Sequence, residues 1–114
     1  MNTSITEEVI VLTYNSDSFP MSLGLPLEKL RLIDPVKTDR IKECVRTELI
    51  KIVIFDGCLP MDVLLTTCKV VKDIRRKNKL NLKIFIINQD EILVEGAEYV
   101  QNPKKIKEYL KIAA

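Results

Sequence analysis

The chain has 114 residues, of which 46% are hydrophobic and 30% are charged, and its formal net charge is +2. This length and composition are typical of one soluble globular domain covering residues 1–114, and no apolar run approaches the roughly 18 residues that cross a membrane. The first residues do not combine a basic segment with an apolar one, so we expect a cytoplasmic protein without a secretory signal.

Histidine is absent from the sequence, and the three cysteines, Cys44, Cys58 and Cys68, show no C-x-x-C spacing. The absence of histidine excludes Ser-His-Asp and Cys-His catalysis and removes a common metal ligand. The odd number and irregular spacing of the cysteines argue against a disulfide framework or a zinc site. We therefore expect reduced thiols, no bound metal and no cofactor.

The first half of the chain predicts two strands and one helix. Val9–Tyr14 is a short β-branched run typical of a buried strand, and the turn formers of Asn15–Pro26 indicate a loop or a short broken helix. Leu27–Ile33 alternates loosely, which favours a strand over a helix. A surface helix of about three turns is predicted to begin at Thr38, because apolar residues follow it at helical spacing: Ile41, Cys44, Val45 and Leu49.

The stretch Ile50–Asp62 organises the sequence. Its first part, Ile-Lys-Ile-Val-Ile-Phe, reads as a strand buried on both faces of a parallel sheet, and the run stops at Asp56. Ligands of open α/β sheets bind at the carboxyl ends of the strands. Asp56 is therefore the candidate site residue.

The second half of the chain predicts a helix, two strands and a closing helix. Met61–Lys77 places apolar residues on one helix face and a basic patch on the rest, formed by Lys69, Lys72, Arg75 and Arg76. Leu82–Asn88 is another buried strand, and Tyr99 and Val100 form a short apolar segment. The final helix, Lys104–Ala113, is predicted to face inward with Ile106, Tyr109, Leu110 and Ala113. Strands that alternate with helices predict a parallel sheet with right-handed crossovers.

Two segments resemble those of response-regulator receiver domains. Asp56-Gly-Cys-Leu-Pro60, followed by Met61-Asp62, resembles the receiver segment in which a phospho-accepting aspartate stands four residues before a proline. The segment from Gly96 to Pro103, Gly-Ala-Glu-Tyr-Val-Gln-Asn-Pro, resembles the receiver pattern Gly-Ala-x-x-Tyr-hydrophobic-x-Lys-Pro. The resemblance implies a flavodoxin-like α/β three-layer sandwich with a five-stranded parallel sheet of order 2-1-3-4-5. The short connecting segments imply that its first and fourth helices are shortened or missing.

The resemblance also implies which residues phosphorylation would need. A receiver holds a divalent cation with two acids at the end of strand one, but this sequence offers Tyr14 and Asn15 there, with Asp17 two residues late. Asn88 replaces the hydroxyl residue at the end of strand four, and Asn102 replaces the lysine before Pro103. For Asp56 we favour a strand-end carboxylate bonded to nearby backbone amides over a residual phosphoacceptor.

The resulting hypothesis is a non-enzymatic pseudo-receiver that binds a protein partner in a signalling or regulatory pathway. As the family resemblance suggests, it would form a homodimer through its last strand and helix, with Tyr99, Asn102, Lys105 and Tyr109 as candidate contact residues. For Tyr109, packing on the sheet is the favoured alternative to a partner contact.

Two other functions compete with this hypothesis. The basic patch could contact nucleic acid, but its helix lacks aromatic residues for base stacking, so a solvated outer face is favoured. A small flavodoxin-like enzyme is the weakest alternative, because the sequence contains no Gly-rich phosphate loop. Among the cysteines, Cys44 and Cys68 are predicted to be buried, whereas Cys58 is predicted to be an exposed thiol without a nucleophilic role.

Overall fold

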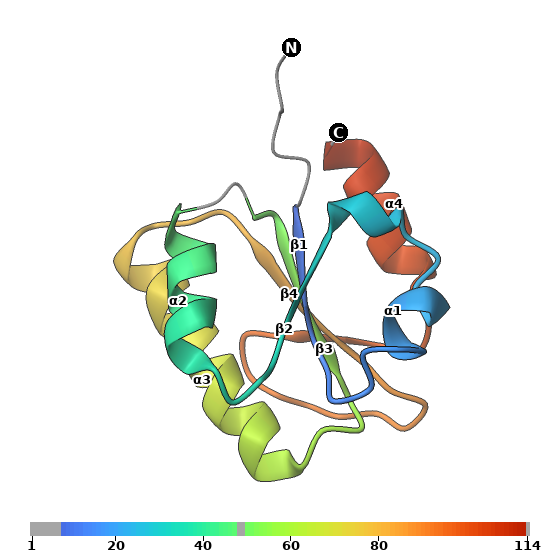
Figure 1. Ribbon diagram of the computed structural model, residues 1–114, viewed down its shortest axis with the longest axis horizontal. Coiled ribbons are helices and arrows are strands. Elements are labelled where there is room, and N and C mark those ends of the chain that lie inside the picture. Colours follow the sequence, from blue (N-terminus) through green and yellow to red (C-terminus); the bar gives the residue numbers. More distant parts are fainter. Residues whose placement is uncertain (1–7, 48–49, 114) are drawn as a thin grey trace.

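The structure is a computed structural model that describes residues 8–47 and 50–113. Figure 1 shows a twisted central sheet with helices on both of its sides. The predicted inward positions of Leu49 and of the Ala113 side chain lie outside the described residues.

Five parallel strands form one sheet in the order β2-β1-β3-β4-β5. This order confirms the predicted flavodoxin-like α/β sandwich. The central strand β3 pairs with β1 on one side and β4 on the other, and its last residue, Asp56, lies opposite Ile87. The strands are β1 (Val9–Leu12), β2 (Leu30–Ile33), β3 (Ile52–Asp56), β4 (Lys83–Ile87) and β5 (Glu98–Val100).

The helices cover the two faces of the sheet unequally. Helices α2 and α3 lie together on one face, and α1 and α4 lie on the other (Figure 1). The first helix has only four residues, and residues 88–97, all of them described, contain no helix. The predicted shortening of the first helix and loss of the fourth are thus confirmed. The helices are α1 (Phe19–Ser22), α2 (Thr38–Thr47), α3 (Met61–Lys77) and α4 (Lys104–Ala113), with a 3-10 turn, η1 (Leu27–Lys29), before β2.

The strand boundaries differ from the sequence prediction by one to three residues. Strand β3 begins at Ile52 rather than Ile50, and β4 covers Lys83–Ile87 rather than Leu82–Asn88. The first strand ends at Leu12 rather than Tyr14, because the Thr13 hydroxyl accepts a hydrogen bond from the Asn15 amide at 2.9 Å and so turns the chain. The second strand begins at Leu30 rather than Leu27. The three residues before it, Leu27–Lys29, form the 3-10 turn η1 instead of an extended strand. The Lys29 amide closes this turn by donating to the Pro26 carbonyl at 3.0 Å.

The core is divided by the sheet into two apolar clusters. One cluster lies between the sheet and α2 and α3 and contains Phe55, Cys44 and Cys68, whereas the other contains Phe85 and faces α4. All five residues of β3 are buried, as expected for the centre of a parallel sheet. Each buried Phe side chain contributes roughly 1.5–3 kcal/mol of hydrophobic stabilisation. Cys44 and Cys68 are buried and Cys58 is exposed, as the sequence predicted.

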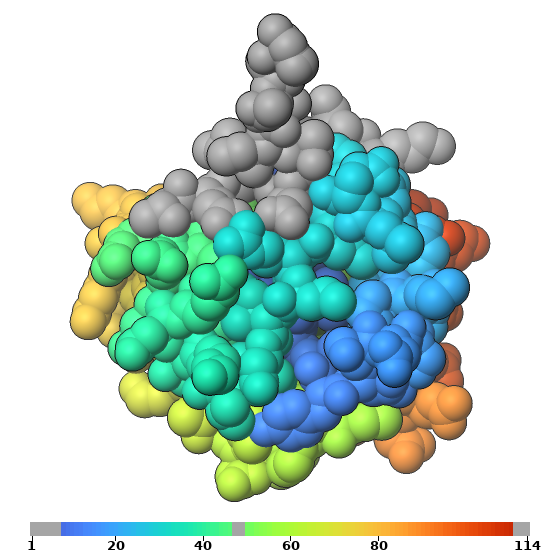
Figure 2. Space-filling model, viewed as in Figure 1, coloured from blue at the N-terminus to red at the C-terminus, as the bar shows by residue number. Residues whose placement is uncertain are grey.

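The sheet's N-terminal strand is also fully enclosed. All four residues of β1 are buried, and the segments around β2 and α1 cover most of this strand in the space-filling view (Figure 2).

Among the helices of residues 8–47 and 50–113, none is long and apolar enough to cross a lipid bilayer.

Candidate functional site

The carboxylate of Asp56 lies at the carboxyl end of β3 and is only 6% exposed. Its Oδ2 atom accepts a hydrogen bond from the Thr13 hydroxyl at 2.6 Å, and its Oδ1 atom accepts one from the Cys58 amide at 2.9 Å. Both oxygens therefore have partners within the chain. The backbone bond is of the kind expected from the sequence, whereas the threonine bond is not.

Thr13 is the site residue that sequence reasoning missed. Leu12 pairs with Phe55 in the sheet, so the next residue of each strand, Thr13 and Asp56, reaches the same edge. The missed signal was that Thr13 is the first polar residue after the buried run Val9–Leu12, just as Asp56 is the first after its own run. A buried hydroxyl next to a carboxylate is a strong neutral donor, and a 2.6 Å separation is typical of such a charge-assisted bond.

The residues at the expected positions of the acidic pair are turned elsewhere. Tyr14 is 53% exposed, and the Asn15 side chain accepts a hydrogen bond from the Ser18 amide at 3.3 Å, at the start of α1. Asp17 lies on the exposed turn between Asn15 and α1. In the described part of the chain, no cluster of three or more His, Cys, Asp or Glu residues is arranged to hold a metal ion.

The loop after Asp56 is packed tightly against the end of β4. The Gly57 amide donates to the Ile87 carbonyl at 2.8 Å, and a Cβ atom at Gly57 would lie 2.4 Å from the Asn88 Cβ and 2.6 Å from the Ile87 carbonyl oxygen. Glycine is therefore required here by lack of space. Asn88 itself donates from its side chain to the Asp90 carbonyl at 3.0 Å, so it serves the loop that follows β4.

The thiol of Cys58 lies beside Asp56 on the exposed loop. The negative charge of Asp56 raises the pKa of this thiol, and partial burial raises it further. A raised pKa keeps the thiol protonated near neutral pH, and the protonated form is a poor nucleophile. The electrostatics therefore give no support to a nucleophilic role for Cys58.

The four candidate partner residues lie along the β5 and α4 side of the molecule, but not on one surface. Tyr99 pairs with Ile86 and so points to the α2 and α3 face, where its hydroxyl lies 2.9 Å from the Asn88 carbonyl oxygen. Lys105 and Tyr109 belong to α4 on the opposite face.

Each of these candidates also has an internal contact. Lys105 forms an ion pair with Glu98 of β5. The ring of the half-buried Tyr109 packs edge-on against Phe85, with the ring centroids 6.2 Å apart. The exposed Asn102 accepts a hydrogen bond from the Lys104 amide at 3.0 Å and so supports the start of α4. Asn102 and Lys105 are the two members that present exposed side chains.

The basic patch of α3 is engaged within the chain. Lys69 and Arg76 pair with Asp73 at 3.6 and 3.3 Å. Lys72 donates to the Glu95 carbonyl at 2.7 Å, and Arg75 donates to the Gly96 carbonyl at 3.4 Å. These cations stabilise the helix and the loop between β4 and β5.

No protein-family model, no curated protein and no solved structure matches the chain.

Proposed function

We propose that the chain is a receiver-like, non-enzymatic interaction module of a regulatory pathway, and that Asp56 is a structural residue and not a phosphoacceptor. The observation that carries this proposal is the 2.6 Å hydrogen bond from Thr13 to Asp56. Thr13 stands at the end of β1, where receiver chemistry would need acids to hold a divalent cation. A neutral hydroxyl brings no charge that could bind such a cation.

The surroundings of Asp56 argue in the same direction. A carboxylate that attacks phosphorus needs a free lone pair and a cation that neutralises the phosphoryl oxygens. Asp56 is buried, and each of its oxygens already accepts a hydrogen bond. Each oxygen keeps a further lone pair, so the bonds themselves do not prevent attack. Burial limits the access of a phosphoryl donor to Asp56, and the described residues offer no cluster of acids that could hold the cation.

The partner surface of this proposal is the edge formed by β5 and α4. Strand β5 has three residues and is the last strand of the sheet, so its outer side is free of a neighbouring strand of this chain's sheet. Exposed Asn102 and Lys105 lie next to it, and the half-buried Tyr99 and Tyr109 flank it on opposite faces. A second copy of the chain binding at this edge would form the homodimer.

Acetyl phosphate with Mg²⁺ tests the loss of phosphorylation. The wild-type protein and Asp56→Asn are incubated with the donor, and their intact masses are compared. We expect no phosphoryl adduct on either protein. An adduct on the wild type that is absent from Asp56→Asn would overturn the proposal.

Sedimentation equilibrium tests the homodimer. The proposal predicts a dimer for the wild type, a shift to monomer for Lys105→Glu at the β5 edge, and a retained dimer for Lys104→Glu, which makes the same charge change on the preceding residue. A monomeric wild type at all soluble concentrations would contradict the homodimer.

No described contact favours the nucleic-acid alternative, because the cations of the basic patch already have partners.

A further inference from the structure

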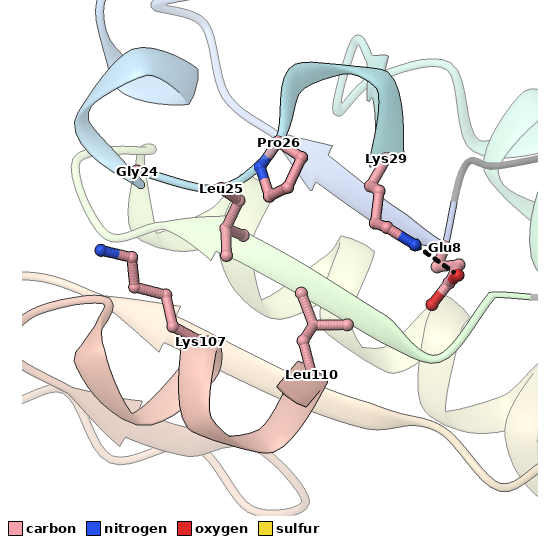
Figure 3. A pocket seen from close by; sticks show the side chains of 7 residues that line it. All are labelled: Glu8, Gly24, Leu25, Pro26, Lys29, Lys107 and Leu110. Carbon is pink, nitrogen blue, oxygen red and sulfur yellow. Dashed lines mark hydrogen bonds and ion pairs between the residues drawn. The ribbon is translucent and has the colours of Figure 1, made fainter. Parts of the chain in front are cut away.

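A cavity of about 330 Å³ lies between α4 and the segment that joins α1 to β2. Figure 3 shows Leu25 and Leu110 facing each other across it, with Lys107 at one end and the Glu8–Lys29 ion pair at the other. The remaining lining residues are Gly24 and Pro26. This volume is at the lower end of the range found for small-molecule sites.

The cavity follows from the shortened first helix. Helix α1 has four residues and therefore spans about 6 Å, whereas a four-residue strand beneath it spans roughly 13 Å. After α1 the chain turns at Gly24, whose φ is +65°, and continues through Leu25 and Pro26 without helical structure. The face of the sheet that carries α4 is thus left partly uncovered near the amino ends of the strands.

The walls of the cavity are apolar and its charge is positive. Leu25 and Leu110 are 7% and 9% exposed and belong to the apolar cluster on this face. The lining contains two lysines, Lys29 and Lys107, and one acid, Glu8. One net positive charge therefore borders an apolar surface.

The two lysines are in different electrostatic states. Lys29 donates to Glu8 at 2.9 Å, so its charge is already compensated. The Lys107 ammonium forms no ion pair or hydrogen bond with any residue that the structure describes, and it lies 2.9 Å from the point where a Cβ of Gly24 would be. Gly24 thus leaves room for Lys107 at the end of the cavity, and Glu8 disfavours an anion at the other end.

We propose that this cavity binds a small amphipathic carboxylate, with its head group on Lys107 and its apolar body between Leu25 and Leu110. An uncharged apolar ligand would make no use of the Lys107 charge, and a compact inorganic anion would leave the leucine walls unused. The inference does not depend on the proposed function, because the cavity lies at the opposite end of the sheet from Asp56.

Octanoate, octanamide and acetate, titrated into the ¹⁵N-labelled full chain and followed by amide chemical shifts, test this site. Octanoate should shift the amides of Gly24, Leu25, Lys107 and Leu110 saturably, octanamide should bind more weakly, and acetate should not bind. Shortening octanoate to hexanoate should weaken binding by at most about fourfold per methylene.

Two variants with the same loss of charge isolate Lys107. Lys107→Gln should weaken octanoate binding about two- to fivefold, as expected for one exposed ion pair, while octanamide binding stays unchanged. Lys104→Gln, on the same helix but outside the cavity, should leave octanoate binding unchanged. Equal losses in the two variants, acetate binding as tight as octanoate binding, or shifts that map away from the cavity would overturn the proposal. The amide spectrum of each variant also reports whether it is folded.

Discussion

At the residue scale, Asp56 is held by one side-chain donor and one backbone donor. Thr13 donates to one carboxylate oxygen and the Cys58 amide donates to the other. The same Thr13 hydroxyl accepts from the Asn15 amide, so it joins the end of β1 to the end of β3 and also turns the chain after β1. An acid in place of Thr13 would repel Asp56 unless a cation lay between the two carboxylates. The choice of a hydroxyl therefore makes this strand end stable without a cation.

Thr13→Val should lower the free energy of unfolding by about 1.5–3 kcal/mol, because it leaves a buried carboxylate without one of its donors while keeping the side-chain volume. Urea denaturation near neutral pH measures the change. Thr13→Ser is the matched control, since it keeps the hydroxyl and should lose less. Equal stability of the wild type and Thr13→Val would show that the bond does not hold the strand ends together.

At the element scale, the segments that connect the strands determine where the cavity beside α4 lies and how residues 88–97 pack against α3. The short α1 leaves the cavity beside α4. The segment 88–97, which has no helix, lies against α3 through Lys72 and Arg75, whose side chains donate to the Glu95 and Gly96 carbonyls. Gly96 has a φ of +87°, and a Cβ there would lie 2.4 Å from the Lys72 Cδ, so the lysine side chain packs directly over the glycine. Two cations of the basic patch thus replace the packing that a helix would provide.

Lys72→Met should loosen the segment 88–97 without changing global stability by more than about 0.5 kcal/mol, because it keeps most of the side chain but removes the exposed donor. Hydrogen exchange measures the effect at Ala97, whose amide donates to the Val94 carbonyl at 3.1 Å, and we expect exchange roughly two- to fivefold faster. Lys69→Met, which affects only the pair with Asp73 on the same helix, should leave this amide unchanged. Unchanged exchange in Lys72→Met would contradict the role of Lys72.

The starts of three strands are joined at Glu8. Its carboxylate pairs with Lys29, before β2, at 2.9 Å and with Lys51, before β3, at 3.4 Å. The hydrogen bond from Lys29 lowers the pKa of Glu8 below its ordinary value, and burial opposes this only in part. A carboxyl whose folded-state pKa is lowered stabilises the fold above its unfolded pKa, and this stabilisation is lost as the pH falls through the folded pKa.

Glu8→Gln should therefore lower the free energy of unfolding by about 0.5–1 kcal/mol at pH 7, a range that allows for the partial exposure of both lysines. At pH 3 the difference from the wild type should be smaller, because Glu8 is then protonated in the unfolded state and its stabilising effect declines as the pH falls toward the folded-state pKa. Urea denaturation at the two pH values measures this difference. Glu91→Gln, at an exposed acid of the β4–β5 segment, should show no such change. A loss of equal size at both pH values would mean that Glu8 acts through packing and not through its charge.

At the scale of the whole molecule, the alternation of apolar runs with helical patterns predicted a parallel sheet, and the resemblance of two segments to receiver domains implied its strand order, which the structure has. The run Ile52–Asp56 is buried on both faces, and Cys44, Cys68 and Leu110 occupy the buried positions that helical spacing predicted. These features are local, so the sequence carries them directly.

The site was less predictable because it depends on register. The expected position of the acidic pair, Tyr14 and Asn15, lies one residue beyond Thr13, which the pairing of β1 with β3 brings to Asp56. The candidate partner residues were chosen from one motif and one helix. Alternation along β5 nevertheless places Tyr99 on one face of the sheet and Glu98 on the other. Lys105 forms its ion pair with Glu98 and so lies on the face opposite Tyr99. Contacts between distant segments, such as Lys72 with Glu95, leave no local pattern to detect.

The central claim is that Asp56 is a structural acid on a receiver-like scaffold, and the most direct measurement is titration of the ¹⁵N-labelled protein with beryllofluoride and Mg²⁺. Beryllofluoride forms a phosphoryl-like adduct only where a carboxylate and a bound cation act together. The account predicts no saturable change at the amides of Thr13, Asp56, Gly57 and Cys58. Saturable shifts at these amides that require Mg²⁺ and disappear in Asp56→Asn would contradict it.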